Sequence, residues 1–157
     1  MLIPKPETLK RLNNINKLLE TIYKQPIQLS DILKRNELED KEITLLRDTH
    51  LDEYISTLLG QLQSTIGNFT KTRHYEILVS RFGLNDQPIP TLENLGNGFG
   101  ISRERVRQLE IKALRRLRHP RAKTHIESTI VDLAKEILKL PPKANTISPQ
   151  ISLSPIP

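Results

Sequence analysis

Several residue types that usually decide a protein's class are missing or scarce in this sequence. Among its 157 residues there is no cysteine and no tryptophan, and there are only three phenylalanines and three tyrosines. Without cysteine the chain can form neither a disulfide nor a thiolate metal site, so metal binding would have to use histidine and carboxylate. The length suffices for one ordinary domain, or for a small domain beside a helical accessory piece.

Long hydrophobic runs are also missing. The amino-terminal stretch MLIPKPETLKRL lacks the apolar segment of a secretory signal, and no apolar run approaches the roughly 20 residues that a membrane helix requires. We therefore expect a soluble, cytoplasmic protein with no membrane partner.

Residues suited to catalysis are few. The histidines are His50, His74, His119 and His125. None of the four is spaced with a second histidine and a carboxylate as a metal site requires. The three closely spaced glycines at 96, 98 and 100 form no phosphate loop, because no strand precedes them and no GK[ST] follows. We expect no enzymatic activity, no catalytic residue, no metal and no cofactor.

The positive charge is concentrated in the middle of the chain. The formal net charge is +6. Residues 1–69 carry 9 Lys and Arg against 10 Asp and Glu, residues 70–125 carry 12 against 5, and residues 126–157 carry 3 against 3. Because a generally basic surface would spread its charge along the chain, this distribution indicates a surface in the middle segment that binds a polyanion.

Helical periodicity runs through most of the sequence, and the period-two alternation of strands is missing. The pattern predicts an all-α protein that begins with a helical segment over residues 1–69. A first helix, about residues 7–24, has one apolar face made of Leu9, Leu12, Ile15, Leu19 and Ile22. Ser30 is the expected cap of a brief helix, and Asp40 the expected start of one long helix that ends at Gly67.

The pattern changes after Thr70. A helix through Phe82 is followed by a polar loop, a short helix, a tight turn and a strongly basic helix. An amphipathic segment over residues 121–140 then aligns Ile126, Ile130, Leu133 and Ile137. Residues 141–157 are rich in proline and serine, so we expect a disordered tail.

The segment TLENLGNGFGISRERVRQLEIKALRRLRHP, residues 91–120, is punctuated like a helix-turn-helix. Thr91 is a good N-cap for the first helix, and Phe99 closes it. Gly100, together with Gly98, permits the left-handed backbone of a tight turn, and Ser102 can cap the second helix.

The second helix separates into an apolar and a polar side at about 100° per residue. The apolar stripe consists of Val106, Leu109, Ala113 and Leu117. The opposite side consists of Arg103, Glu104, Arg107, Gln108, Arg115 and Arg118. An Arg fork suits guanine, Gln suits adenine, and Glu can accept from a cytosine amino group, so this mixture is typical of a surface that reads bases in the major groove. The alternative is a solvated helix face of ordinary Glu and Arg neighbours.

The run YEILVSRFGL followed by residues 91–120 resembles the fourth conserved region of the sigma-seventy family of bacterial RNA polymerase sigma factors. The resemblance covers about a third of the chain, and regions two and three of the family are not found. The aromatic-rich second region, which melts the minus ten element, has no counterpart here. The resemblance therefore implies binding to the promoter's minus thirty-five element, without promoter opening by this chain alone.

The resemblance also assigns roles to individual residues. Base-reading positions are Arg103, Glu104, Arg107 and Gln108. Backbone contacts are expected from Lys71, Arg73, Thr91, Ser102 and Arg105, and contacts to upstream DNA or an activator from Lys112, Arg115 and Arg118. Ile111 stands where the family usually has a small residue; it could touch a thymine methyl group or a protein partner, or pack on the following helix.

These expectations divide the chain into three parts. Residues 1–69 form a helical interaction segment, residues 70–140 a wingless helix-turn-helix DNA-binding domain with one further helix, and residues 141–157 a tail. The implied partners are double-stranded DNA, the β-subunit flap of core RNA polymerase, and a second sigma-like subunit or regulator bound through residues 1–69. The implied function is a nucleoid-associated initiation factor or regulator. The alternatives are a free-standing regulator that works without polymerase, and an interaction protein that titrates polymerase or an anti-sigma factor.

Overall fold

The computed structural model describes residues 3–139, and within them every regular element is an α-helix. The helices are α1 (Pro6–Tyr23), α2 (Leu29–Arg35), α3 (Asp40–Thr49), α4 (Leu51–Phe69), α5 (Thr72–Arg81), α6 (Leu92–Phe99), α7 (Arg103–Leu117) and α8 (Pro120–Leu138). The all-α prediction is confirmed for this range. The disordered tail expected over residues 141–157 lies outside the described residues. In the described range, none of the helices has both the length and the apolar character that a bilayer crossing would need.

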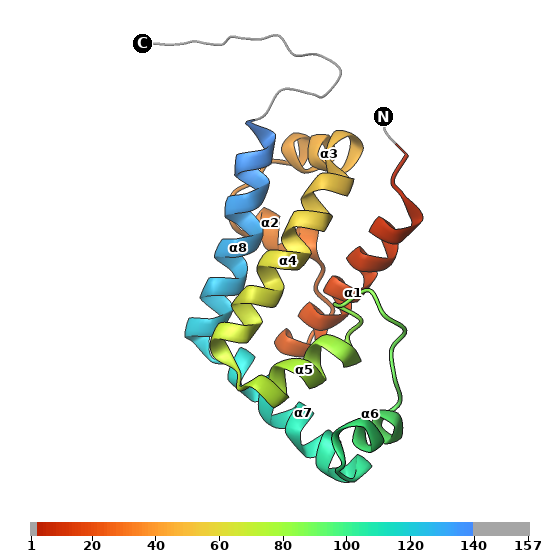
Figure 1. Ribbon diagram of the computed structural model, residues 1–157. Helices are drawn as coiled ribbons and strands as arrows, with labels where there is room; N and C mark the ends of the chain where they lie inside the picture. Colours follow the sequence, from red (N-terminus) through yellow and green to blue (C-terminus); the bar gives the residue numbers. More distant parts are fainter. Residues whose placement is uncertain (1–2, 140–157) are drawn as a thin grey trace.

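The two longest helices of the described range, α4 and α8, lie side by side and run in opposite directions (Figure 1). Helices α2 and α3 pack against α8, and α1 packs against α4. The hydroxyl of Tyr54 on α4 donates to the carbonyl of Ile130 on α8 at 2.8 Å, inside the core. Residues before and after the helix-turn-helix therefore share one large hydrophobic core, to which α5 and the last turns of α7 also contribute.

Helices α6 and α7 lie at the end of the molecule opposite the start of α1 and the end of α8 (Figure 1). A second, smaller core holds them to α5. It is made of the buried residues Ile77, Val106 and Leu109, with Leu92, Leu95, Phe99 and Ile101 packed around them. The helix-turn-helix thus projects from the main bundle, and its outer face is free of the N-terminal helices.

The prediction of one long helix from Asp40 to Gly67 is wrong. The backbone leaves helical geometry at His50, which has φ −131° and ψ 14°, and α4 then starts at Leu51. The break lets α3 turn back against α8, where Leu46 is buried and Ile43 is partly buried in the large core. Tertiary packing overrides a continuous helical pattern here.

Two local predictions in the first 30 residues are also wrong. Ser30 lies inside α2, and Gln28 is the N-cap, with its N–H donating to the Asp31 carboxylate at 2.8 Å. Leu9 is 46% exposed, because the first turn of α1 is held by polar contacts instead. The hydroxyl of Thr8 donates to Asp52 on α4 at 2.5 Å, which turns the neighbouring leucine toward solvent.

Candidate nucleic-acid interface

The boundaries of α6 and α7 follow from the capping residues in the sequence. The hydroxyl of Thr91 accepts a hydrogen bond from the N–H of Asn94 at 3.0 Å, and Ser102 accepts one from Arg105 at 3.0 Å. Between the helices, Gly100 adopts φ +71°, a left-handed conformation that favours glycine. The predicted caps and the predicted turn glycine are confirmed.

A different glycine makes the turn tight. A Cβ on Gly96 would lie 2.6 Å from the carbonyl oxygen of Ile101, so only glycine permits this close approach of the turn to α6. Gly98, which we expected to assist the turn, has ordinary helical backbone and open space around it. The expectation for Gly98 was wrong, because the restriction here comes from backbone packing and not from a second left-handed residue.

Helix α7 has the register expected from its sequence. The apolar stripe is buried, and it consists of Val106, Leu109, Ala113 and Leu117. The four side chains expected to read bases are all exposed on the opposite side, and they are Arg103, Glu104, Arg107 and Gln108. The first two turns of α7 therefore present these four groups outward together, without cover from the rest of the described chain.

The polar groups on this face pair with each other in the free protein. The Arg107 guanidinium donates to the Glu104 carboxylate through Nε at 3.0 Å and through Nη2 at 2.7 Å. This hydrogen bond lowers the pKa of Glu104 and raises the pKa of Arg107. Arg105 donates to the Gln108 side-chain carbonyl at 3.3 Å. Since all four residues are exposed, these pairs can be exchanged for contacts to a ligand at small cost.

A basic cavity of about 420 Å³ lies on one flank of α7, next to the start of α5. It is lined by Lys71, His74, Arg105, Leu109, Lys112, Arg115 and Arg116. The structure therefore brings together residues that the sequence assigned to two roles: Lys71 and Arg105 to the DNA backbone, and Lys112 and Arg115 to upstream DNA or an activator.

Two members of this cavity were not singled out from the sequence. Arg116 is one, and the spacing from Arg105 through Lys112 to Arg116 places the three on one side of α7, so the helical period could have revealed it. The other is His74, which is only 8% exposed. Burial lowers its pKa, and the nearby charges of Lys71 and the α7 cations lower it further. Only the fold shows that this histidine faces those cations.

The remaining backbone candidates do not line this cavity. The guanidinium of Arg73 lies 4.4 Å from the centre of the Phe99 ring and so joins α5 to α6. Thr91 and Ser102 are exposed, and their hydroxyls retain a proton that can be donated outward while they cap the helices. Ile111 is 38% exposed and belongs to neither core.

Arg118 is set apart from the other predicted site residues. It lies at the end of α7, and its guanidinium donates to the carbonyls of Thr21 at 2.8 Å and Ile22 at 3.1 Å. These two carbonyls belong to the last turn of α1, where no intrahelical partner is available. In this structure Arg118 therefore caps α1.

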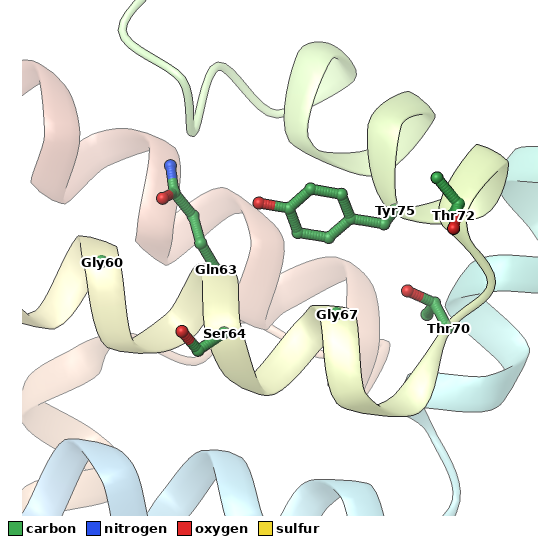
Figure 2. A pocket seen from close by; sticks show the side chains of 7 residues that line it. All are labelled: Gly60, Gln63, Ser64, Gly67, Thr70, Thr72 and Tyr75. Atoms are coloured by element: carbon green, nitrogen blue, oxygen red, sulfur yellow. The ribbon is translucent and has the colours of Figure 1, made fainter.

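A hollow between α4 and α5 differs in character from the basic cavity (Figure 2). It has a volume of about 350 Å³ and is lined by Gly60, Gln63, Ser64, Gly67, Thr70, Thr72 and Tyr75. None of these residues is charged, so the hollow lacks the cations that line the basic cavity. The polyanion-binding features of the described residues are thus gathered around α7.

Comparison with known proteins agrees with this geometry. Residues 71–119 match the family model described as sigma-70, region 4. The chain is 42% identical over 83 residues to RNA polymerase sigma factor SigA of a Bacillus species, and to the same extent to SigA of Listeria monocytogenes and of Listeria innocua. These alignments cover 53% of this chain and 21% of each relative, so the chain spans about a fifth of the length of the curated relatives that it matches. No solved structure matches the chain. Residues 71–119 therefore resemble region 4 of the sigma-70 family, and they lie between helices that are outside the family model.

Proposed function

We propose that this protein binds double-stranded DNA in a sequence-dependent way through α7 and acts in transcription initiation. In this proposal it is a sigma-like factor or regulator that recognises a minus thirty-five-type element and contacts RNA polymerase. The observation that carries the proposal is the exposed cluster of Arg103, Glu104, Arg107 and Gln108 on the second helix of a region 4 helix-turn-helix.

The chemistry of this cluster favours base reading over simple charge attraction. A helix that only gripped phosphates would gain nothing from a carboxylate directed at a polyanion. On entry into a major groove, Glu104 can accept from a cytosine amino group while Arg107, released from it, donates its fork to guanine or to a phosphate. In the free protein the two side chains are paired with each other, so binding would exchange this exposed pair for contacts to bases.

Phosphate contacts are proposed for the flanks of α7. Lys71 and Arg105 line the basic cavity on one flank of α7, whereas Arg73 contacts Phe99 of α6 and Thr91 caps α6. A recognition helix in the major groove meets a sugar-phosphate strand on each side, so we propose that these two groups contact the two strands. Residues 1–69 leave the polar face of the first two turns of α7 uncovered, and we propose that they bind a second sigma-like subunit or another regulator.

A selection from randomised duplexes tests the proposal. The wild-type protein should enrich one short motif, and on that motif Arg107→Ala or Glu104→Ala should cost about 1–3 kcal/mol and relax the preference for bases. Lys71→Ala should weaken every sequence alike, because it would remove a phosphate contact. Arg47→Ala is the control, since Arg47 is exposed on α3 at the other end of the molecule.

Two results would contradict parts of the proposal. If the wild type and the Arg107 variant bound matched and scrambled duplexes equally well, base reading would be excluded. If the protein bound its selected motif tightly but did not co-purify with core RNA polymerase, the initiation role would give way to that of a free-standing regulator.

A further inference from the structure

The basic cavity beside α7 has an unusual balance of charge. Its lining includes the five cationic side chains Lys71, Arg105, Lys112, Arg115 and Arg116, and no carboxylate. Like charges gathered around one hollow repel each other, so the protein alone holds them in an unfavourable arrangement. A single anion inside the cavity would relieve that repulsion.

His74 lies in the same lining and is more than nine-tenths buried. Its Nδ1 is closed off from solvent and is the only buried side-chain polar atom without a hydrogen-bond partner in the described range. Its Nε2 also forms no hydrogen bond there, but it is not closed off. Because Nδ1 cannot be reached by a ligand, Nε2 is the ring nitrogen that can donate to an acceptor held by the surrounding cations.

We propose that this cavity binds one phosphate group of the DNA backbone, and that His74 donates a hydrogen bond from Nε2 to a phosphate oxygen and becomes protonated more readily when the phosphate is bound. The inference rests on the proposed DNA-binding function and adds His74 to the residues proposed to contact the DNA backbone. A phosphodiester fits the site better than a carboxylate-bearing partner, because the cavity lies on the flank of the helix whose adjacent face carries the proposed base-reading groups.

The groups that face His74 decide the sign of the pH effect. In the free protein, burial and the charges of Lys71, Arg105, Lys112 and Arg116 hold the pKa of His74 below its ordinary value. A bound phosphate brings negative charge against the ring and raises the pKa toward or above that value. Linkage then requires DNA affinity to rise as the pH falls through the pKa of the complex, and to level off below the pKa of the free protein.

Nuclear magnetic resonance of the full-length wild-type protein tests this without any substitution. The His74 ring resonances are titrated with pH in the free protein, with a bound duplex, and with inorganic phosphate at equal ionic strength. We expect the duplex to raise the pKa of His74 by about one unit, which corresponds to a tenfold gain in affinity across the transition. A duplex that binds and leaves the titration of His74 unchanged would overturn the inference. So would a shift with inorganic phosphate and none with the duplex, which would make a free anion the occupant.

Variants and modified DNA provide an independent test. The ratio of affinities at pH 5.5 and pH 8.0 should be about tenfold larger for the wild type than for His74→Gln. His50→Gln is the matched control, because His50 is equally buried but lies between α3 and α4, far from α7. A neutral methylphosphonate linkage, moved along one strand, should abolish the pH-dependent part at one or two positions. Failure of the wild type to bind any duplex would refute the proposed function, whereas binding with a pH dependence that no linkage and no His74 variant alters would refute this inference alone.

Discussion

Replacement of Arg118 by alanine separates a structural role from a role in binding. The guanidinium of Arg118 donates two hydrogen bonds to the last-turn carbonyls of Thr21 and Ile22 in α1, 96 or 97 residues earlier in the chain. Alpha1 has no basic residue in its own last turn, so the negative end of its dipole is compensated from α7. We therefore expect Arg118 to stabilise the fold.

The magnitude follows from the number and type of the lost contacts. A hydrogen bond to a charged group contributes about 1.5–3 kcal/mol, but water can partly replace the guanidinium at this half-buried site. We expect Arg118→Ala to lower the free energy of unfolding by about 2–3 kcal/mol, or the midpoint of thermal unfolding by roughly 6–9 °C. Arg118→Lys, which keeps the charge but loses the fork, should recover about half of this.

Urea unfolding followed by circular dichroism measures the effect, with duplex affinity recorded at 25 °C, where all variants are folded. Arg115→Ala is the control, since Arg115 lies on the same helix, is exposed, and donates no side-chain hydrogen bond within residues 3–139. Its stability should change by less than about 0.5 kcal/mol while its DNA affinity falls. The reasoning would be refuted if Arg118→Ala were as stable as the wild type and bound DNA more weakly.

Three further predictions concern packing and pH. Gly96→Ala should destabilise the protein by about 2–3 kcal/mol, because its Cβ would meet the carbonyl oxygen of Ile101. Gly98→Ala, in open space on the same helix, should stabilise the protein by about 0.5–1 kcal/mol. Equal effects of the two substitutions in thermal unfolding would contradict the close approach of the turn to Gly96. Tyr54→Phe should cost about 0.5–1.5 kcal/mol in urea unfolding, because the core loses the hydrogen bond from the Tyr54 hydroxyl to the Ile130 carbonyl, and an unchanged midpoint would argue against that hydrogen bond. The hydrogen bonds from the Arg11 guanidinium hold the pKa of Asp86 below its ordinary value, so the pair stabilises the protein above about pH 4 and this stabilisation is lost as the pH falls through the lowered pKa. In Asp86→Asn the free energy of unfolding should therefore fall less steeply as the pH is lowered below about 4. The same pH dependence in the variant and the wild type would exclude this contribution.

The helix-turn-helix could be predicted from the sequence because its determinants are local. Thr91 and Ser102 cap the helices that directly follow them, and Gly100 supplies a backbone conformation that few other residues adopt. The apolar stripe of α7 has a regular helical period, so its exposed face follows from the buried one. Each of these features depends on residues within a few positions of one another in the chain.

Features that depend on distant segments were missed or placed wrongly. The break at His50 exists because α3 turns back onto α8, and nothing near residue 50 indicates where α8 will lie. The α7 sequence suggests that Arg118 is a solvent-facing cation, yet its Nε and Nη2 donate to carbonyls at the end of α1. In the sequence His74 is an isolated histidine, and only the packing of α7 against α5 brings the cations of α7 close to it.

The position of α7 explains why the N-terminal helices matter to the interface although none of them covers it. The first half of α7 packs through Val106 and Leu109 into the small core with α5 and α6, and its second half packs through Leu114 and Leu117 into the large core with α1, α4 and α8. One rigid helix therefore belongs to both cores. Because a helix does not bend freely between its turns, any shift of α1 or α8 that moves the end of α7 also turns its first two turns, where Arg103 and Arg107 lie. A partner that binds the N-terminal helices can in this way change the presentation of the DNA-facing side chains without touching them.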